Sequence, residues 1–281
     1  MSTQTQMPTQ AQAQEIQGQN GRVVGGSTDG TAYDKVMKAR ANNRFTSMDF
    51  INEIFQGFTE MHGDRRFADD KAIVAGLGWL EDMPVTIIGI EKGHDIKTRT
   101  MRNFGSAHPE GYRKALRQMK LAEKFKRPVI CFVDTSGAYC GIGAEERGQG
   151  QAIAENLMEM MSLNTPIISV IIGEGGSGGA LALAVADEVW MLENSIYSVI
   201  SPEGCASILW KDNNKAKEAS ENLRLTADDL LELGIIEKIL PEDDVLFPFL
   251  KIELVKTLER LQSMPLSQLT ENRYQRFRVM G

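Results

Sequence analysis

The chain has 281 residues, of which 42% are hydrophobic and 25% charged, as is typical of a globular protein with a sizeable core. Its formal charge of -7, from 31 Lys and Arg against 38 Asp and Glu, disfavours a protein whose whole surface binds nucleic acid. Three cysteines without zinc-ribbon spacing exclude a disulfide framework and disfavour a metal site on this chain. A reducing cytoplasm is therefore the expected compartment.

Residues 1–43 are expected to form a disordered or weakly ordered N-terminal tail. Glutamine fills seven of the first twenty positions, and Gly, Ser and Thr follow. The first 30 residues contain neither an apolar run nor an Arg-rich pattern, so they do not predict a signal peptide, a membrane anchor or a transit peptide. No stretch of 18 apolar residues occurs, so no membrane-spanning helix is expected.

Residues 44–262 are expected to form one domain of alternating helices and strands, followed by a polar C-terminal tail over 263–281. The hydrophobic pattern predicts helices at 47–58, 109–126, 145–161, 178–186, 202–210, 226–233 and 245–261. It predicts strands at 72–80, 84–91, 128–133, 167–172, 188–192 and 235–240. The first two strands form a hairpin, and the later alternation predicts a mostly parallel α/β sheet.

Glycine is abundant and histidine is scarce. Eleven of the 26 glycines lie between residues 137 and 204, where some positions must need positive φ or close approach of the backbone. The chain has only three histidines, His62, His94 and His108, which is a small supply for histidine-based catalysis. Backbone groups are therefore candidates for the chemistry.

The segment Gly173-Glu174-Gly175-Gly176-Ser177-Gly178-Gly179 follows a predicted strand and opens a predicted helix. Residues 173–178 match the dinucleotide fingerprint G-x-G-x-x-G, with Glu193 twenty residues further on. The following helix, of about nine residues, is shorter than a usual crossover helix in such folds, and the motif comes late in the chain. Both features disfavour a dinucleotide site.

Residues 175–179 also match G-x-S-x-G, the nucleophile elbow, with Ser177 as the nucleophile. That fold places its histidine after the serine, whereas all three histidines precede Ser177. A Ser–Lys variant stays open. A third interpretation uses the bare N–H groups at the start of the helix, which can stabilise an oxyanion without an ionisable side chain. Five glycines in seven residues exceed what a tight turn requires.

Two further segments are candidates for the same crevice. Residues 134–141 follow the preceding strand, and the carboxyl ends of parallel strands meet at one edge of a sheet. Residues 201–204 begin another helix, for which a plain capped start is an equally good interpretation. Cys140 has no nearby group in sequence that would activate it, so we interpret it as an incidental thiol.

Residues 92–127 carry a local positive charge. They contain 11 Lys and Arg against three acidic residues, a balance of +8. The bland interpretation is a solvated helix face, but the excess also suggests a polyanion such as a phosphorylated cofactor, an acidic partner or nucleic acid.

Several long strings resemble the carboxyltransferase α subunits of bacterial acetyl-coenzyme A carboxylases. The resembling segments are 64–74, 103–105, 109–116, 134–148, 173–182, 197–211 and 272–276. The resemblance covers residue 44 to the end and implies a single-domain, crotonase-like ββα superhelix. Ser136 and Cys140 replace two prolines of the family pattern, which loosens that loop because proline fixes φ.

The resemblance implies transfer of a carboxyl group from carboxybiotin, on biotin carboxyl carrier protein, to acetyl-CoA, the first committed step of fatty acid synthesis. It assigns the backbone N–H groups of Gly178 and Gly179 as the oxyanion hole for the ureido oxygen of biotin. Residues expected to contact substrate in the same crevice are Gly137, Ala138, Gly175, Gly176, Glu203 and Gly204. The biotin ring nitrogen can take the methyl proton of acetyl-CoA, so no side-chain base is required.

The implied partners are a β subunit that carries a zinc ribbon and most of the coenzyme A site, and a biotin carboxylase that uses ATP. The implied assembly is α2β2. Two enzymatic alternatives stay open, a biotin-dependent decarboxylase and a carboxyltransferase for a longer acyl-CoA, because the acyl pocket lies largely on the partner. A non-catalytic nucleic-acid-binding regulator that uses residues 92–127 is an alternative from a different class.

Overall fold

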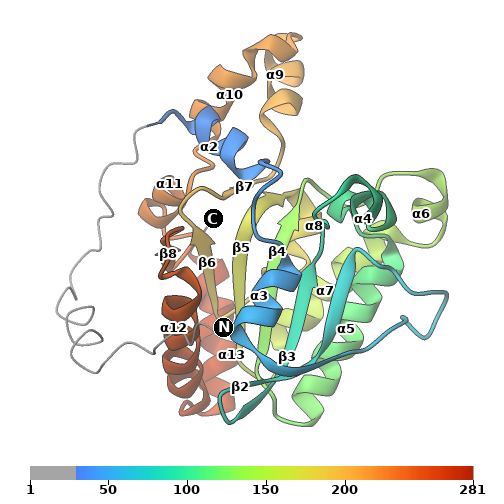
Figure 1. Ribbon diagram of the computed structural model, residues 1–281, viewed down its shortest axis with the longest axis vertical. Helices are drawn as coiled ribbons and strands as arrows, with labels where there is room; N and C mark the ends of the chain where they lie inside the picture. Colours follow the sequence, from blue (N-terminus) through green and yellow to red (C-terminus); the bar gives the residue numbers. More distant parts are fainter. Residues whose placement is uncertain (1–29, 281) are drawn as a thin grey trace, which may run out of the picture. The chain divides into compact units, whose positions relative to one another are not determined.

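An eight-stranded mixed sheet lies at the centre of the computed structural model, which describes residues 30–280 (Figure 1). The strands are β1 (Gln56–Glu60), β2 (Ile73–Leu80), β3 (Met83–Ile90), β4 (Val129–Thr135), β5 (Ile167–Gly176), β6 (Glu188–Leu192), β7 (Ile196–Ser198) and β8 (Lys238–Leu240). Their order is β1-β2-β3-β4-β5-β6-β8, and β7 pairs with the end of β5. The predicted hairpin is confirmed as antiparallel β2 and β3, while the pairs from β3 to β8 are parallel.

Two layers of helices bury the two faces of this sheet (Figure 1). The helices are α2 (Ala32–Ala39), α3 (Ser47–Ile54), α4 (Ile96–Met101), α5 (Pro109–Lys124), α6 (Ile142–Glu146), α7 (Gln149–Ser162), α8 (Ser177–Leu181), α9 (Pro202–Trp210), α10 (Ala216–Leu223), α11 (Ala227–Glu232), α12 (Leu246–Gln262) and α13 (Leu266–Arg278). Side chains of α5, α7 and α11 pack on one face, and those of α3 and α12 on the other.

Strand β4 shows why its sequence reads as one continuous apolar run. Val129 and Cys131 point into the core under α5 and α7, whereas Ile130 and Phe132 point into the core under α3 and α12. Successive side chains of a strand face opposite sides, and here both sides are dry. The prediction of a buried parallel strand at 128–133 is therefore confirmed.

The helix predicted over 145–161 is two helices in the structure. Helix α6 ends at Glu146 and α7 begins at Gln149, and the break lies at Gly148, whose φ is 83°. This left-handed conformation suits glycine and interrupts the helical hydrogen bonds.

The strand predicted over 167–172 continues to Gly176. Glu174, Gly175 and Gly176 pair with the short strand β7, so tertiary pairing overrides the low strand propensity of glycine. Strands β1 and β7 were not predicted, and the segment 55–58 predicted as the end of a helix belongs largely to β1.

Helices lie beyond both expected domain boundaries, since α2 precedes residue 44 and α13 follows residue 262. Arg273 on α13 is fully buried and donates to Asp187 and to the carbonyl oxygens of Met160, Leu163 and Thr165. Residues 263–280 are thus part of the folded unit that runs from Thr31, rather than a tail. The disorder predicted for residues 1–29 lies outside the described residues. Among residues 30–280, no helix combines the length and apolar character needed to cross a membrane.

Candidate active site

The ends of strands β4 and β5 bring the two candidate loops together. Thr135 pairs with Gly175, and the carboxylate of Asp134 accepts a hydrogen bond from the backbone N–H of Glu174 at 2.8 Å. A side chain at Gly179 would place its Cβ 2.5 Å from the backbone nitrogen of Ala138, and one at Gly176 would strike the carbonyl of Ser136. The two loops therefore lie side by side, as the topology of parallel strands predicts, and these two glycines permit the close approach. We refer to the surface where they meet as the crevice.

Helix α8 begins at this crevice with a sharp change of direction. Ser177 has a φ of 52°, which is unusual for a residue other than glycine. Gly178 and Gly179 follow in the first turn, where a helix offers no internal acceptor for the backbone N–H groups. Two neighbouring donors of this kind can bind an oxygen that develops negative charge.

A chain of buried and half-buried charges contacts the glycine segment. Glu174 accepts from Arg40 Nε at 2.7 Å and pairs with Lys92 Nζ at 3.2 Å. Lys92 also pairs with Asp134 at 2.7 Å, and Arg40 Nη1 pairs with Glu203 at 2.7 Å. These five side chains join α2, β3, β4, β5 and α9 at one place, which fixes the relative positions of the elements that form the crevice.

The charges in this chain stabilise one another. Burial disfavours the carboxylate of Glu174, but the charges of Lys92 and Arg40 and their hydrogen bonds outweigh it and hold the Glu174 pKa below its usual value. Burial likewise disfavours charged Lys92, yet Asp134 and Glu174 raise its pKa. Both groups are therefore ionised at neutral pH, with a charged partner on each side.

Comparison with known proteins gives the family. The family described as acetyl co-enzyme A carboxylase carboxyltransferase-like matches residues 2–281. The protein named acetyl-coenzyme A carboxylase carboxyl transferase subunit alpha of Ruminiclostridium cellulolyticum is 62% identical over 255 residues, which cover 89% of this chain and 98% of that protein. The chain belongs to this family of carboxyltransferase α subunits.

A second relative is named for both a β and an α subunit in one chain. The protein named acetyl-coenzyme A carboxylase carboxyl transferase subunits beta/alpha of Natranaerobius thermophilus is 58% identical over 259 residues, covering 89% of this chain and 43% of that longer protein. Among solved structures, transcarboxylase 12S with hydrolyzed methylmalonyl-coenzyme A bound has a TM-score of 0.67 at 17% identity, over 83% of this chain and 45% of that chain. The fold is thus the crotonase-like α/β fold that the resemblance implied.

Some of the predicted site residues lie where the two loops meet, while others lie apart from that place. Gly137 and Ala138 lie against Gly176 and Gly179, close enough that a Cβ on either glycine would meet their backbone atoms. Gly175 lies within the sheet, paired with both Thr135 and Tyr197. Glu203 reaches the crevice loops only through Arg40, and the N–H of Gly204 donates to Ser201 Oγ at 3.1 Å as part of the helix cap. The contacts of these last three residues therefore give them supporting roles.

Sequence reasoning missed three side chains that hold the crevice, namely Arg40, Lys92 and Gln149. The amide of Gln149 donates to the carbonyl oxygens of Ala107 and Tyr139 at 2.9 and 2.8 Å. It thereby joins the 136–141 loop to the segment before α5. Arg40 lies in the segment 1–43, which the sequence predicts to be a tail, and Lys92 lies in the basic segment 92–127. No local pattern marks either residue, because their partners come from distant parts of the chain.

The basic segment 92–127 is largely used inside the protein. Eight of its 11 basic side chains make hydrogen bonds or ion pairs within the described chain: Lys92, Arg99, Arg102, Arg113, Lys114, Arg117, Lys120 and Arg127. Lys114 is fully buried against Asp69. The expectation that α5 presents a solvated basic face is therefore wrong for most of this segment, which weakens the interpretation as a nucleic-acid-binding surface.

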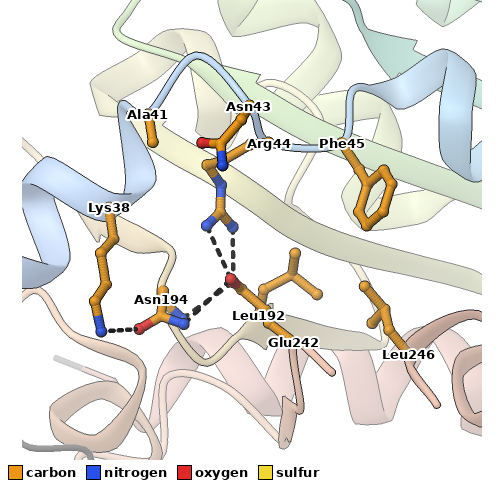
Figure 2. Close-up of a pocket in the computed structure, with 9 residues that line it drawn as sticks. All are labelled: Lys38, Ala41, Asn43, Arg44, Phe45, Leu192, Asn194, Glu242 and Leu246. Atoms are coloured by element: carbon orange, nitrogen blue, oxygen red, sulfur yellow. Dashed lines mark hydrogen bonds and ion pairs between the residues drawn. The ribbon is translucent and has the colours of Figure 1, made fainter. Parts of the chain in front are cut away.

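Two cavities flank the N-terminal segment that follows α2. Figure 2 shows the first, of about 230 Å³, where Arg44 forms a bidentate pair with Glu242 and Asn194 bonds the same carboxylate. It lies at the ends of β6 and β8 rather than at the glycine crevice. The second, of about 190 Å³, is lined by Arg40, Lys92, Asp134, Ser136 and Glu174, among others. This second cavity adjoins the crevice loops, and the charged side chains that contact the glycine segment form part of its wall.

Proposed function

We propose that this chain provides the oxyanion-binding half of a carboxyltransferase that moves a carboxyl group from carboxybiotin to acetyl-CoA and forms malonyl-CoA. The observation that carries the proposal is the crevice in which Gly178 and Gly179 open α8 opposite Gly137 and Ala138, in a chain that is 62% identical to a named α subunit. The absence of a Cβ at Gly176 and Gly179 lets the two loops pack backbone against backbone, which holds the start of α8 beside residues 136–138.

The chain's own contribution would be positioning and electrostatics. The backbone N–H groups of Gly178 and Gly179 donate to the ureido oxygen of the bound biotin, where negative charge gathers as the carboxyl group leaves. Gly137 and Ala138, on the neighbouring loop, would help to keep the ring in place. Carboxybiotin supplies the transferable carboxyl group. These donors carry no titratable proton, so this half of the site needs no histidine.

The partners follow from the same proposal. The names of the relatives imply a β subunit, and the fused β/α protein of Natranaerobius thermophilus supports the close association of the two. We place most of the coenzyme A site and a zinc ribbon on that β subunit, in an α2β2 assembly. Biotin carboxyl carrier protein would deliver carboxybiotin, after a biotin carboxylase loads it with the use of ATP. The complex would act in the cytoplasm, at the first committed step of fatty acid synthesis.

Co-expression with a β subunit tests the proposal. The isolated chain should be inactive, and the co-purified complex should carboxylate acetyl-CoA with carboxybiotin as donor. Acetyl-CoA should be preferred over propionyl-CoA, because relatives at 57–62% identity carry the acetyl-CoA name. A complex that transfers only to the longer acyl-CoA, or that only releases CO2, would favour the two alternative enzymes. A complex without any of these activities would contradict the proposal.

A further inference from the structure

Tyr112 on α5 lies directly beneath the crevice and has a hydroxyl group with no partner. The residue is fully buried, and its hydroxyl oxygen makes no hydrogen bond to any of residues 30–280. The oxygen lies 2.9 Å from the point that a Cβ on Gly179 would occupy, and the nitrogen of Ala138 lies 2.5 Å from the same point. The hydroxyl is therefore next to the place where the two crevice loops touch.

A buried hydroxyl without a partner destabilises the folded chain, because it has lost its hydrogen bonds to water and gained none. Phenylalanine would fill the same space in the core without this penalty. Burial, and to a lesser degree the charge of Asp70, raises the pKa of Tyr112, so the hydroxyl keeps its proton and stays both a donor and an acceptor. The buried hydroxyl is therefore available to bond any backbone group of the two loops that comes within reach.

Other unpartnered atoms gather at the same place. Residues 30–280 contain four buried side-chain nitrogen or oxygen atoms without a partner, and the other three are Arg44 Nε, Gln149 Oε1 and Asn156 Oδ1. Gln149 and Asn156 lie on α7, and their amide groups hold the carbonyl oxygens of Tyr139 and Ala182, one on each side of the crevice. Three of the four atoms thus belong to α5 and α7, the helices packed beneath the two loops, and only Arg44 Nε lies elsewhere among the described residues.

We propose that Tyr112 is a positioning residue, whose hydroxyl hydrogen-bonds the backbone of Gly137 and Ala138 when substrate occupies the crevice. A small local change in that loop would suffice, because the nitrogen of Ala138 and the hydroxyl already adjoin the same point. The bond would fix the spacing between this loop and Gly179, and hence the alignment of the oxyanion donors. The inference rests on the proposed function, because it needs a substrate-bound state of that crevice.

The test is Tyr112→Phe in the complex with the β subunit, with wild-type transfer measured first. If the wild type transfers no carboxyl group, the proposed function fails and this inference falls with it. With an active wild type, Tyr112→Phe should lower kcat by about tenfold to a hundredfold and change KM by less than about threefold, because a misplaced donor is felt in the transition state. The Tm of the isolated variant should equal or exceed that of the wild type.

Tyr274→Phe is the matched control, since Tyr274 is exposed on α13 and should keep wild-type kcat and Tm. A wild-type kcat for Tyr112→Phe would overturn the inference, because the hydroxyl would then have no part in the reaction. A loss seen only in KM, or a clearly lower Tm of the isolated variant, would also overturn it. The second result would mean that the hydroxyl is already bonded in the resting fold.

Discussion

Arg40 and Glu174 are 134 residues apart in sequence, yet Arg40 Nε donates to Glu174 Oε1 at 2.7 Å. Glu174 stands inside the glycine segment, two residues before the last residue of β5. The same guanidinium holds Glu203 at the start of α9. The segment after α2 thus anchors the glycine segment from behind, and the crevice depends on a residue that contacts none of its lining groups directly.

Replacement of Arg40 by lysine tests whether one side chain must hold Glu174 and Glu203 at the same time. A lysine ammonium is a single point of charge and does not reproduce a guanidinium that spans two carboxylates. We expect Arg40→Lys to lower the free energy of unfolding by about 1–2 kcal/mol, since the pair is only partly buried. The transfer rate of the complex should fall as well. The control is Arg66→Lys, at an exposed pair with Glu155, which should leave both quantities unchanged. Equal behaviour of the two variants would contradict the anchoring role of Arg40.

Glu174 should make the stability of the chain depend on pH. Its folded-state pKa is lowered below its ordinary value of 4.5, so its ionic contribution is fully present above about pH 4.5. That contribution is lost as the pH falls through the lowered folded-state pKa. We expect Glu174→Gln to be less stable than the wild type by about 2–3 kcal/mol at pH 7, and the difference to shrink below pH 4.5.

Urea unfolding at a series of pH values measures this difference. Glu259→Gln, at an exposed position of α12, should show no such pH-dependent difference. A gap between wild type and Glu174→Gln that stays constant down to pH 3 would show that the carboxylate charge is not what stabilises the loop.

A substitution of Ser177 distinguishes between two interpretations of the glycine segment, a nucleophilic serine and backbone N–H donors. Its left-handed backbone and position between strand and helix fit a nucleophile elbow, but no described histidine or lysine makes a hydrogen bond with its side chain. If backbone donors act, Ser177→Ala should keep the transfer rate within about threefold of the wild type, because every N–H group remains. A loss of a thousandfold or more in a folded complex would indicate a nucleophilic serine instead.

The C-terminal helix α13 should contribute strongly to the stability of the fold. The guanidinium of Arg273 is fully buried, pairs with Asp187 at 2.8 Å and donates to three backbone carbonyl oxygens. Arg273→Met leaves Asp187 buried without its cation, which typically costs about 3–5 kcal/mol. Thermal unfolding should show a Tm lower by several degrees, while Arg278→Met on the exposed face should match the wild type. An unchanged Tm for Arg273→Met would mean that α13 adds little to the fold.

The sequence predicted those features that depend on local pattern. The run at 128–133 is apolar at every position, and Pro109 opens a helix whose apolar side chains recur every three or four residues, so β4 and α5 were predicted nearly to their ends. Helix α13 was not predicted, because one of its inward-facing residues, Arg273, is charged and so does not contribute to an apolar periodicity. Burial of Arg273 is favourable only because Asp187 and three backbone carbonyl groups accept its hydrogen bonds in the folded chain.

The same distinction between local patterns and long-range contacts applies to the candidate site. The glycine segment could be found because its spacing lies in seven consecutive residues, and the meeting of the two loops followed from the topology of parallel strands. The charges of Arg40, Lys92 and Glu174 could not be found, because their pairing joins three distant segments. Tyr112 counted only as one more apolar position of a helix, although its hydroxyl adjoins Gly179.

The central claim is that backbone donors beside Gly179 perform this half of the chemistry, and Gly179→Ala tests it most directly. The added Cβ would lie 2.5 Å from the nitrogen of Ala138 and push the two loops apart, whereas Gly150→Ala on α7 adds a Cβ in open space. Both variants should fold and co-purify with the β subunit. We predict that Gly179→Ala lowers carboxyl transfer by about a hundredfold or more, in the range for loss of one oxyanion donor, and that Gly150→Ala transfers as the wild type does. Wild-type transfer by a folded Gly179→Ala complex would contradict the account.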